Sequence, residues 1–295
     1  MRSGMVAVVG RPNVGKSSLV NALVGRKVSI VTRKPQTTRH RIQGVIHRGG
    51  GQIVLVDTPG LHLKQSGALN QYMNDTAAAS LPGVDLVLFV VEAGKWNEED
   101  EAVLKRLSRV QAPVGLVINK VDKFGDKTRL LPEIEAQAAR REYAFILPVS
   151  ALKRDNLDKL GHELLSRMPE GQPLYPADQV EGQDLRFVLS EIVREKLMER
   201  LQQELPYVLT VQVEKLEEEE GLTRVEAVIW VERENQKAIV IGEKGKALKA
   251  VGIMARKEME ARLGQKVFLK LWARSAKNWT DDPQALKRFG YVGSD

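Results

Sequence analysis

The stretch Gly10-Arg11-Pro12-Asn13-Val14-Gly15-Lys16-Ser17 has the form G-x-x-x-x-G-K-S. It follows a β-branched run at Met5–Val9 and precedes a segment with helical spacing at Ser17–Gly25. Its glycines let the backbone fold tightly, so that N–H groups point at phosphate oxygens. Lys16 adds a positive charge for the β- and γ-phosphates, and the Ser17 hydroxyl is placed to bind Mg²⁺. The stretch therefore predicts a phosphate-binding loop between a strand and a helix, with a tight turn and an exposed lysine as the alternative.

A second motif, Asp57-Thr58-Pro59-Gly60, directly follows the apolar run Gln52–Val56. We expect Asp57 to hold Mg²⁺ through a water molecule. We expect the N–H of Gly60 to face a γ-phosphate and to swing away once that phosphate has left. The motif alone is compatible with a simple turn, but its place after the phosphate loop favours a nucleotide switch.

The segment Lys34–Arg41 lies between the first helix and the second strand, where a mobile switch loop is expected. A threonine in this loop can bind Mg²⁺ only while the γ-phosphate is present, and we favour Thr38 over Thr37. Phosphoryl transfer to water depends mainly on positioning and charge stabilisation, so we expect Lys16, Thr38 and Gly60 to act in hydrolysis. The predicted metal site comprises Ser17, Thr38 and, through water, Asp57.

A third and a fourth motif favour guanine over adenine. Asn119-Lys120-Val121-Asp122 follows the run Val114–Ile118, and Ser150-Ala151 follows Phe145–Val149. The Asp122 carboxylate can accept hydrogen bonds from the ring N–H and the exocyclic amine of guanine, whereas adenine has neither donor on that edge. The Asn119-Lys120 pair can tie the loop to the phosphate loop and cover the base, and backbone N–H groups of Ser150-Ala151 suit the guanine carbonyl. The predicted GTP-binding residues are Asn13, Val14, Gly15, Lys16, Ser17, Ser18, Asp57, Gly60, Asn119, Lys120, Asp122, Ser150, Ala151 and Leu152.

Leu61 occupies the position after the second motif where many GTPases carry a water-orienting glutamine. Leucine cannot orient water, so we expect slow intrinsic turnover. A partner, His62, His40 or a monovalent cation such as K⁺ could replace the glutamine. The oxygen of Asn13 could bind such a cation or make a hydrogen bond that stabilises its loop, and the sequence leaves both alternatives open.

The order of apolar and helical segments predicts the fold of the first ~170 residues. Buried runs alternate with helical patterns, which indicates a mostly parallel sheet with helices on both faces. The motifs follow strands, so all of them should meet at one edge of the sheet. The expected strands are 5–9, 52–56, 85–91, 114–118 and 145–149, and the expected helices are 17–25, 98–110, 128–141 and 156–167.

The pattern changes after a segment rich in Pro and Gly, Met168–Pro176. We divide the chain into a GTP-binding domain at 1–170, a linker at 171–183 and a second domain at 184–295. The second domain should open with a long amphipathic helix at Asp184–Leu205. Its further order, strand, strand, helix, helix and strand, includes an exposed hairpin tip at Glu217–Gly221.

Val240-Ile241-Gly242-Glu243-Lys244-Gly245 has the V-I-G-x-x-G pattern of a KH RNA-binding domain. Two glycines around a short turn let a nucleic-acid backbone approach closely. A turn that merely joins two helices is the alternative, but the α-β-β-α-α-β order, which matches the type II KH fold, favours RNA binding. The predicted RNA-binding residues are Ile241, Gly242, Glu243, Lys244, Gly245, Lys246 and Lys249; nearby apolar residues are Ile239, Leu248, Val251 and Ile253.

Composition sets further limits on the 295-residue chain. Its net charge of +7 favours partners that carry phosphate, although a plain basic surface has the same charge. The absence of cysteines excludes disulfides and thiolate metal sites and fits a reducing cytosol. We expect no signal peptide and no membrane span. Near the end, we expect Trp279 and Tyr291 to lie in the core rather than to stack on bases, and Asp282 to cap a helix that begins at Pro283.

The whole chain resembles the Era family of bacterial GTPases. The residues that carry the resemblance are Gly10–Ser17, Gln36–Arg41, Asp57–His62, Asn119–Asp122, Ser190–Leu197, Glu204–Tyr207, Ile241–Gly245 and Leu286–Val292. The resemblance implies a factor that assists assembly of the 30S ribosomal subunit and binds the 3′ end of small-subunit ribosomal RNA under the control of GTP. It also implies a cytoplasmic protein with peripheral contact to the cell membrane. We expect a monomer.

Three other classes of protein share some of these features. An ATPase or nucleoside kinase would lack the guanine motif Asn119–Asp122. A GTPase of another purpose, such as RNA modification or membrane trafficking, would carry a further catalytic cluster or a lipidation signal. A passive RNA-binding protein with a structural nucleotide would show the same turnover with and without RNA.

Overall fold

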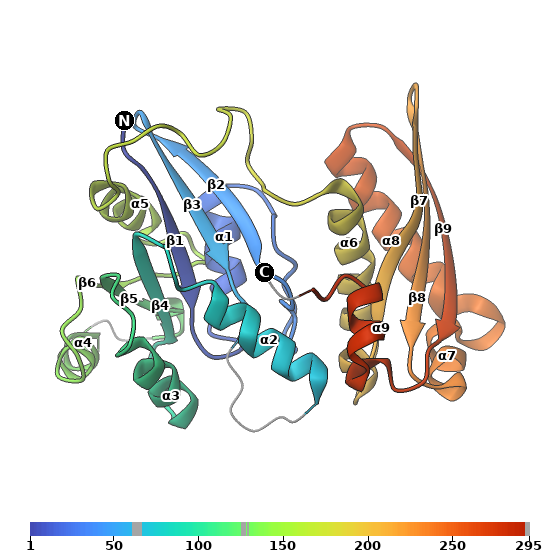
Figure 1. The fold of residues 1–295 in the computed structure, drawn as a ribbon, viewed down its shortest axis with the longest axis horizontal. Helices are drawn as coiled ribbons and strands as arrows, with labels where there is room; N and C mark the ends of the chain where they lie inside the picture. The colour runs from blue at the N-terminus through green and yellow to red at the C-terminus, as the bar shows by residue number, and fades with distance from the viewer. Residues whose placement is uncertain (61–66, 125–127, 129, 293–295) are drawn as a thin grey trace.

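The computed structural model describes residues 1–60, 67–124, 128 and 130–292, which form two units side by side (Figure 1). Each unit has its own sheet, of six strands in the first and three in the second. The first contains β1 (Ser3–Val9), α1 (Lys16–Val24), β2 (Ile42–Arg48), β3 (Gly51–Asp57), α2 (Ala68–Ala79), β4 (Leu86–Glu92), α3 (Glu98–Leu107), β5 (Val114–Asn119), α4 (Leu130–Ala138), β6 (Phe145–Pro148) and α5 (Leu157–Ser166).

The larger sheet has the strand order β2-β3-β1-β4-β5-β6. The strands β3, β1, β4, β5 and β6 run parallel, and β2 pairs antiparallel with β3 at the edge. The sequence analysis missed β2 and α2. The predicted motifs follow β1, β3, β5 and β6, so they meet at the carboxyl edge of the sheet.

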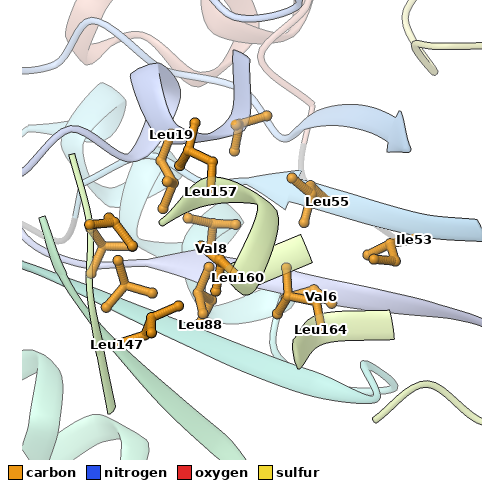
Figure 2. Packing of buried hydrophobic residues seen from close by; sticks show 14 of the residues in the cluster. Val6, Val8, Leu19, Ile53, Leu55, Leu88, Leu147, Leu157, Leu160 and Leu164 are labelled. Atoms are coloured by element: carbon orange, nitrogen blue, oxygen red, sulfur yellow. The ribbon is translucent and has the colours of Figure 1, made fainter. Parts of the chain in front are cut away.

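Alternation along β1 explains why the sheet is covered on both faces. Val6 and Val8 point to one side, where they pack with Leu19 of α1 and Leu160 of α5 (Figure 2). Ala7 points to the opposite side and joins the cluster that α3 contributes to. Side chains of a strand alternate between faces, so an unbroken apolar run indicates burial on both.

The second unit is a mixed three-stranded sheet with helices packed on one face. β7 pairs antiparallel with β8, and β8 pairs parallel with β9. The elements are α6 (Leu185–Arg200), β7 (Thr210–Glu219), β8 (Leu222–Val231), α7 (Glu234–Ile241), α8 (Lys246–Leu263), β9 (Lys266–Ser275) and α9 (Pro283–Arg288). Their order confirms the predicted α-β-β-α-α-β arrangement. Within the described ranges, no helix combines the length and the apolarity that a membrane crossing needs.

The end of α6 differs from the prediction that this helix continues to Leu205. The helix stops at Arg200, and Leu201 is already extended, with ψ of 153°. The Lys34 ammonium, from the predicted switch loop, donates to the carbonyl oxygens of Met198 and Leu201. A side chain from the first unit thus takes the acceptors that another turn of helix would use.

A buried cluster joins the two units around the C-terminal segment. Leu69 and Met73 of α2 pack there against residues that follow β9. Trp279 and Tyr291 are buried, as predicted. The Asp282 carboxylate accepts from the N–H of Gln284, which confirms the predicted helix cap. The second unit therefore contacts the first through its last helix as well as through α6.

Candidate nucleotide site

The phosphate loop folds back on itself through left-handed residues. Asn13 has φ of 62° and Gly15 has φ of 98°. A Cβ atom on Gly15 would lie 2.4 Å from Nδ2 of Asn119, so no other residue fits between this loop and the guanine motif. A cavity of about 270 Å³ opens beside the loop and is lined by Asn13, Gly15, Lys16, Ser17, Ser18, Thr38, Gly60 and Lys120, among others.

Lys16 lies buried under the loop that it is expected to serve. Its ammonium donates to the carbonyl oxygens of Gly10 and Arg11, each at 3.0 Å. Burial lowers the pKa of Lys16 to about 8, and the neighbouring Asp57 carboxylate opposes this shift. An anionic ligand in the cavity would supply a negative charge to balance this buried ammonium.

Oxygen atoms suited to a magnesium ion gather next to Lys16. Ser17 Oγ and Thr38 Oγ1 lie 2.8 Å apart. Asp57 is fully buried, and neither of its carboxylate oxygens has a hydrogen-bond partner among the described residues. Burial raises the pKa of this carboxyl group. A buried carboxylate without a partner, beside two hydroxyls, fits a hydrated Mg²⁺ that also takes ligands from phosphates; within the described chain, no group of three His, Cys, Asp or Glu forms an alternative site.

The structure separates the two threonines of the switch segment. Thr38 faces Ser17, whereas the Thr37 hydroxyl donates to the carbonyl oxygen of Lys34 at 2.7 Å. This geometry supports the choice of Thr38 as the metal ligand. Gly60 also lies against the loop, because a Cβ atom there would be 2.9 Å from Cγ of Pro12.

The guanine motifs contact each other and the phosphate loop. Asn119 donates to the carbonyl oxygen of Val14 at 2.9 Å and accepts from the N–H of Ala151 at 3.1 Å. The Ser150 hydroxyl donates to Asp122 at 2.5 Å, and the Ser150 N–H bonds to the carbonyl of Asp155. Both N–H groups that we expected to meet guanine are thus engaged within the protein. The next residue, Leu152, is exposed.

His40 lies away from the nucleotide cavity, although the sequence analysis considered it as a replacement for the water-orienting glutamine. Its ring stacks on Tyr291, with centroids 4.6 Å apart, and contacts Tyr72 and Phe187 edge-on. Burial lowers its pKa to about 4. His40 therefore belongs to the contact between the units, and it is not among the residues that line the cavity. Leu61 and His62 lie outside the described residues.

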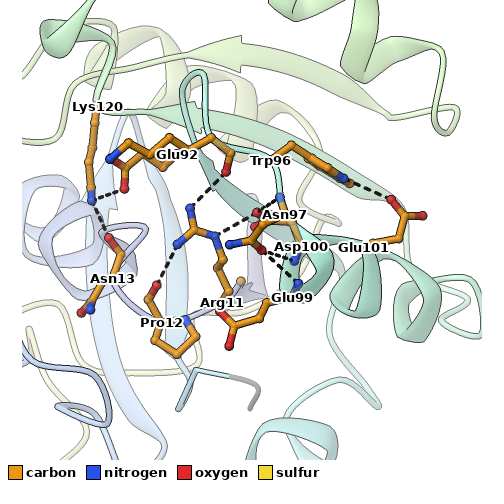
Figure 3. Close-up of polar contacts among 12 residues, drawn as sticks. Arg11, Pro12, Asn13, Glu92, Trp96, Asn97, Glu99, Asp100, Glu101 and Lys120 are labelled. Carbon is orange, nitrogen blue, oxygen red and sulfur yellow. Dashed lines mark hydrogen bonds and ion pairs between the residues drawn. The ribbon is translucent and has the colours of Figure 1, made fainter. Parts of the chain in front are cut away.

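Three charged residues to which the sequence analysis gave no role, Arg11, Glu92 and Asp100, lie close to the phosphate loop or to Lys120 (Figure 3). The Arg11 guanidinium donates to the buried Asp100 carboxylate at 2.9 Å and to the carbonyl oxygen of Lys95 at 3.1 Å. Glu92 accepts from Lys120 at 2.6 Å. The sequence held a signal for Glu92, because this carboxylate directly follows the apolar run Leu86–Val91 and so lies at the same sheet edge as the motifs.

The predicted RNA-binding turn lies on the second unit, between α7 and α8. Gly242 and Gly245 have φ of 72° and 77°. A Cβ atom on Gly242 would lie 2.6 Å from Cβ of Ala247, whereas one on Gly245 would meet nothing within 4 Å. The predicted residues Glu243, Lys244, Lys246 and Lys249 are exposed, and Ile241 is half-buried.

Two apolar side chains beside this turn are exposed. Ile239 is 53% exposed and Ile253 is 42% exposed, whereas Val251 is buried. The surface next to the turn therefore combines open apolar area with lysines. Such a surface suits a strand with unstacked bases and a charged backbone.

Family models match a part of each unit. A family model described as 50S ribosome-binding GTPase matches residues 5–120, and one described as KH domain matches residues 204–280. GTPase Era from Xanthomonas oryzae pv. oryzae (strain MAFF 311018) is 53% identical over 290 residues, which cover 98% of this chain and 97% of that protein. The chain belongs to the Era family of GTPases. Another member, from Xylella fastidiosa (strain M12), is 51% identical over 290 residues, or 98% of this chain and 97% of its own length.

Two solved Era structures match the chain along its length. One, Era in complex with MgGDPNP and nucleotides 1506–1542 of 16S ribosomal RNA, superposes with a TM-score of 0.96 at 39% identity and covers 99% of each chain. The other, an Aquifex aeolicus Era variant bound to GDP·AlF4⁻, gives a TM-score of 0.94 at 39% identity and covers 99% of this chain and 100% of its own. They confirm the predicted fold, a P-loop GTPase domain followed by a KH domain.

Proposed function

We propose that this Era-family GTPase is a switch that binds the 3′ end of small-subunit ribosomal RNA and assists maturation of the 30S subunit. The observation that carries the proposal is the superposition, along 99% of the chain, on an Era protein that holds MgGDPNP and RNA together. We further propose a domain division at 1–170, 171–183 and 184–295, a monomer and a cytoplasmic location. Peripheral membrane contact stays a prediction from the family resemblance.

On this proposal the phosphate side of the cavity acts through fixed positive charge. Lys16 would leave the carbonyl oxygens of Gly10 and Arg11 and bind the β- and γ-phosphates. Ser17 and Thr38 would bind Mg²⁺ directly and Asp57 through water. The ion supplies charge that stabilises the phosphate oxygens as the terminal bond breaks. The N–H of Gly60 would face the γ-phosphate, next to Pro12.

The base side provides selectivity for guanine. Asp122 is exposed and bonded to Ser150, so its second carboxylate oxygen can face the donors of the base. Adenine would leave that carboxylate unpaired. Asn119 holds this loop against Val14 of the phosphate loop. Base and phosphate binding are therefore linked through one buried side chain.

The switch segment connects the proposed nucleotide site with the second unit, which is proposed to bind RNA. Thr38 faces the metal site, and the next residue, Arg39, donates to three backbone carbonyls of the second unit. Loss of the γ-phosphate would free Thr38 and loosen the neighbouring contact. RNA affinity should therefore depend on which nucleotide is bound.

The proposal is tested by binding a short oligonucleotide of the small-subunit rRNA 3′ end in the presence of GDP or GDPNP. We expect tighter binding with GDPNP. Charge reversal in a Lys244→Glu/Lys246→Glu variant should weaken RNA binding at least about tenfold, because two contacts to phosphate are lost, and leave GDP affinity unchanged. Lys257→Glu, an exposed lysine farther along α8, is the matched control. RNA affinity within about twofold of wild type in the double variant would contradict the assignment of the turn.

A further inference from the structure

One buried carboxylate at the carboxyl end of β4 is surrounded by three ammonium groups. Glu92 lies 2.6 Å from Nζ of Lys120 and 3.0 Å from Nζ of both Lys95 and Lys123. Its side chain is only 6% exposed. The three lysines hold the pKa of Glu92 down at about 2 against the opposing effect of its burial, so the carboxylate is charged at any physiological pH.

The three lysines differ in how far solvent reaches them. Lys95 is 63% exposed and Lys123 is 56% exposed, whereas Lys120 is 24% exposed. Exposed ion pairs are weak because water and salt screen them and their side chains lose freedom on pairing. The Lys120 arm is thus the one in which Glu92 and its partner are both largely removed from water.

Lys120 carries this contact into the nucleotide cavity. The same ammonium also donates to the backbone carbonyl oxygen of Asn13 in the phosphate loop (Figure 3). With its backbone left-handed at φ of 66° and its ammonium held by two acceptors, the side chain runs between the guanine motif and the phosphate loop. It also lines the cavity that the nucleotide is proposed to fill.

We propose that Glu92 is a positioning residue that fixes Lys120 across the nucleotide cavity and thereby sets how long the nucleotide stays bound. The inference rests on the proposed assignment of Lys120 to the base. A free lysine side chain has many rotamers, and ordering it on binding reduces affinity. Glu92 orders it beforehand, so the stem already covers the place of the base.

The test uses the full chain and measures the dissociation rate of a fluorescent GDP analogue. Glu92→Gln removes the charge and keeps the shape, and we expect dissociation about tenfold faster, equivalent to about 1.4 kcal/mol. Lys120→Met keeps the stem and removes the ammonium, and it should also speed dissociation. In the Lys120→Met background, Glu92→Gln should change the rate less than about twofold, because the interaction it removes is already absent.

Controls separate positioning from a general loss of stability. Glu101→Gln alters an exposed carboxylate of α3 that pairs with Arg140, and it should leave the rate unchanged. Glu92→Asp keeps the charge but shortens its reach, so it should give an intermediate rate in the wild-type background alone. If Glu92→Gln fails to fold, the dissociation rates of Glu92→Asp with and without the Lys120 ammonium test the proposal instead.

Each outcome decides between the alternatives. An equal effect of Glu92→Gln with and without the Lys120 ammonium would overturn the proposal and assign Glu92 to the stability of the domain. An unchanged rate in Glu92→Gln would overturn it as well. An unchanged GDP dissociation rate in Lys120→Met would overturn the inference alone, because the stem that covers the base is kept. A wild-type chain that fails to bind the GDP analogue would instead contradict the proposed nucleotide site, and the inference with it.

Discussion

Lys16 shows how a single side chain is prepared for its ligand. The sequence motif predicts a lysine that contacts phosphate, and the structure adds that this lysine is buried and bonded to its own loop. Its lowered pKa of about 8 is a consequence that the motif alone does not reveal, because it depends on packing above and below the loop.

This pKa predicts a pH dependence of nucleotide affinity. Phosphate binds the protonated form of Lys16, so above pH 8 binding must take up a proton, and affinity must fall as pH rises. Between pH 7.0 and 8.5 the GDP dissociation constant should rise about fourfold. Fluorescence titration with GDP measures this, and guanosine, which has no phosphate, is the control. A GDP affinity that stays constant over this range would contradict the assigned pKa.

The sequence predicts residues that belong to a motif, but it does not predict residues whose role depends on partners far away in the chain. Asp57, Asn119 and Asp122 could be assigned because their spacing after strands is fixed. Glu92 and Arg39 could not, because Lys120 and Lys123 on one side and the carbonyl partner Pro206 on the other lie at least 28 residues away and are brought close only by the fold. No local pattern marks such a contact.

At the scale of elements, α3 connects helix capping to the phosphate loop. Asn97 accepts from the N–H groups of Glu99 and Asp100, and the Asp100 carboxylate accepts in return from the N–H of Asn97. The same carboxylate oxygen accepts from Arg11. The start of this helix thus supports the loop that follows β1.

Removal of that cap should destabilise the protein by a modest amount. Asn97→Ala should lower the free energy of unfolding by about 1 kcal/mol, because two N–H groups lose their acceptor. The melting temperature should fall by about 2–4 °C. Ser108→Ala, at the other end of α3, removes only a hydroxyl bonded to its own helix and serves as the control. An equal loss in both variants would show that the capping box adds nothing particular.

Elements with a strong hydrophobic period were predicted, and those without one were missed. β2 has a polar residue or glycine at several positions, and a Cβ atom on its Gly44 would lie 2.8 Å from Cγ2 of Val24. The glycine is required by the close approach of α1, a tertiary cause that lowers the apparent strand propensity. α2 was missed because only two of its buried side chains, Leu69 and Met73, are large and apolar.

At the scale of the whole molecule, Arg39 joins the two units. It is fully buried and donates to the carbonyl oxygens of Pro206, Tyr207 and Leu209, at 2.8 to 3.0 Å, and to the Tyr291 hydroxyl at 3.3 Å. A planar guanidinium presents five N–H donors in a fixed fork, whereas a lysine ammonium has three donors on a flexible stem. Since Arg39 follows Thr38, the contact lies next to the predicted metal ligand.

Arg39→Ala should therefore make RNA affinity independent of which nucleotide is bound. We expect the free energy of unfolding to fall by about 2–4 kcal/mol, because buried carbonyls lose a charged donor. We also expect the difference in RNA affinity between GDP and GDPNP to disappear. Urea denaturation and RNA titration measure the two effects. Arg26→Ala, an exposed arginine just after α1, is the control. A nucleotide effect that persists in Arg39→Ala would exclude this route.

The termination of α6 by Lys34 has a kinetic consequence. The length of this helix is not set by its own sequence, because its last acceptors are held by a side chain from the other unit. If the loop that carries Lys34 withdraws, the carbonyls of Met198 and Leu201 pass to water, and the final turn can open without global unfolding. The rate at which its amide hydrogens exchange with solvent would then report the state of a distant nucleotide.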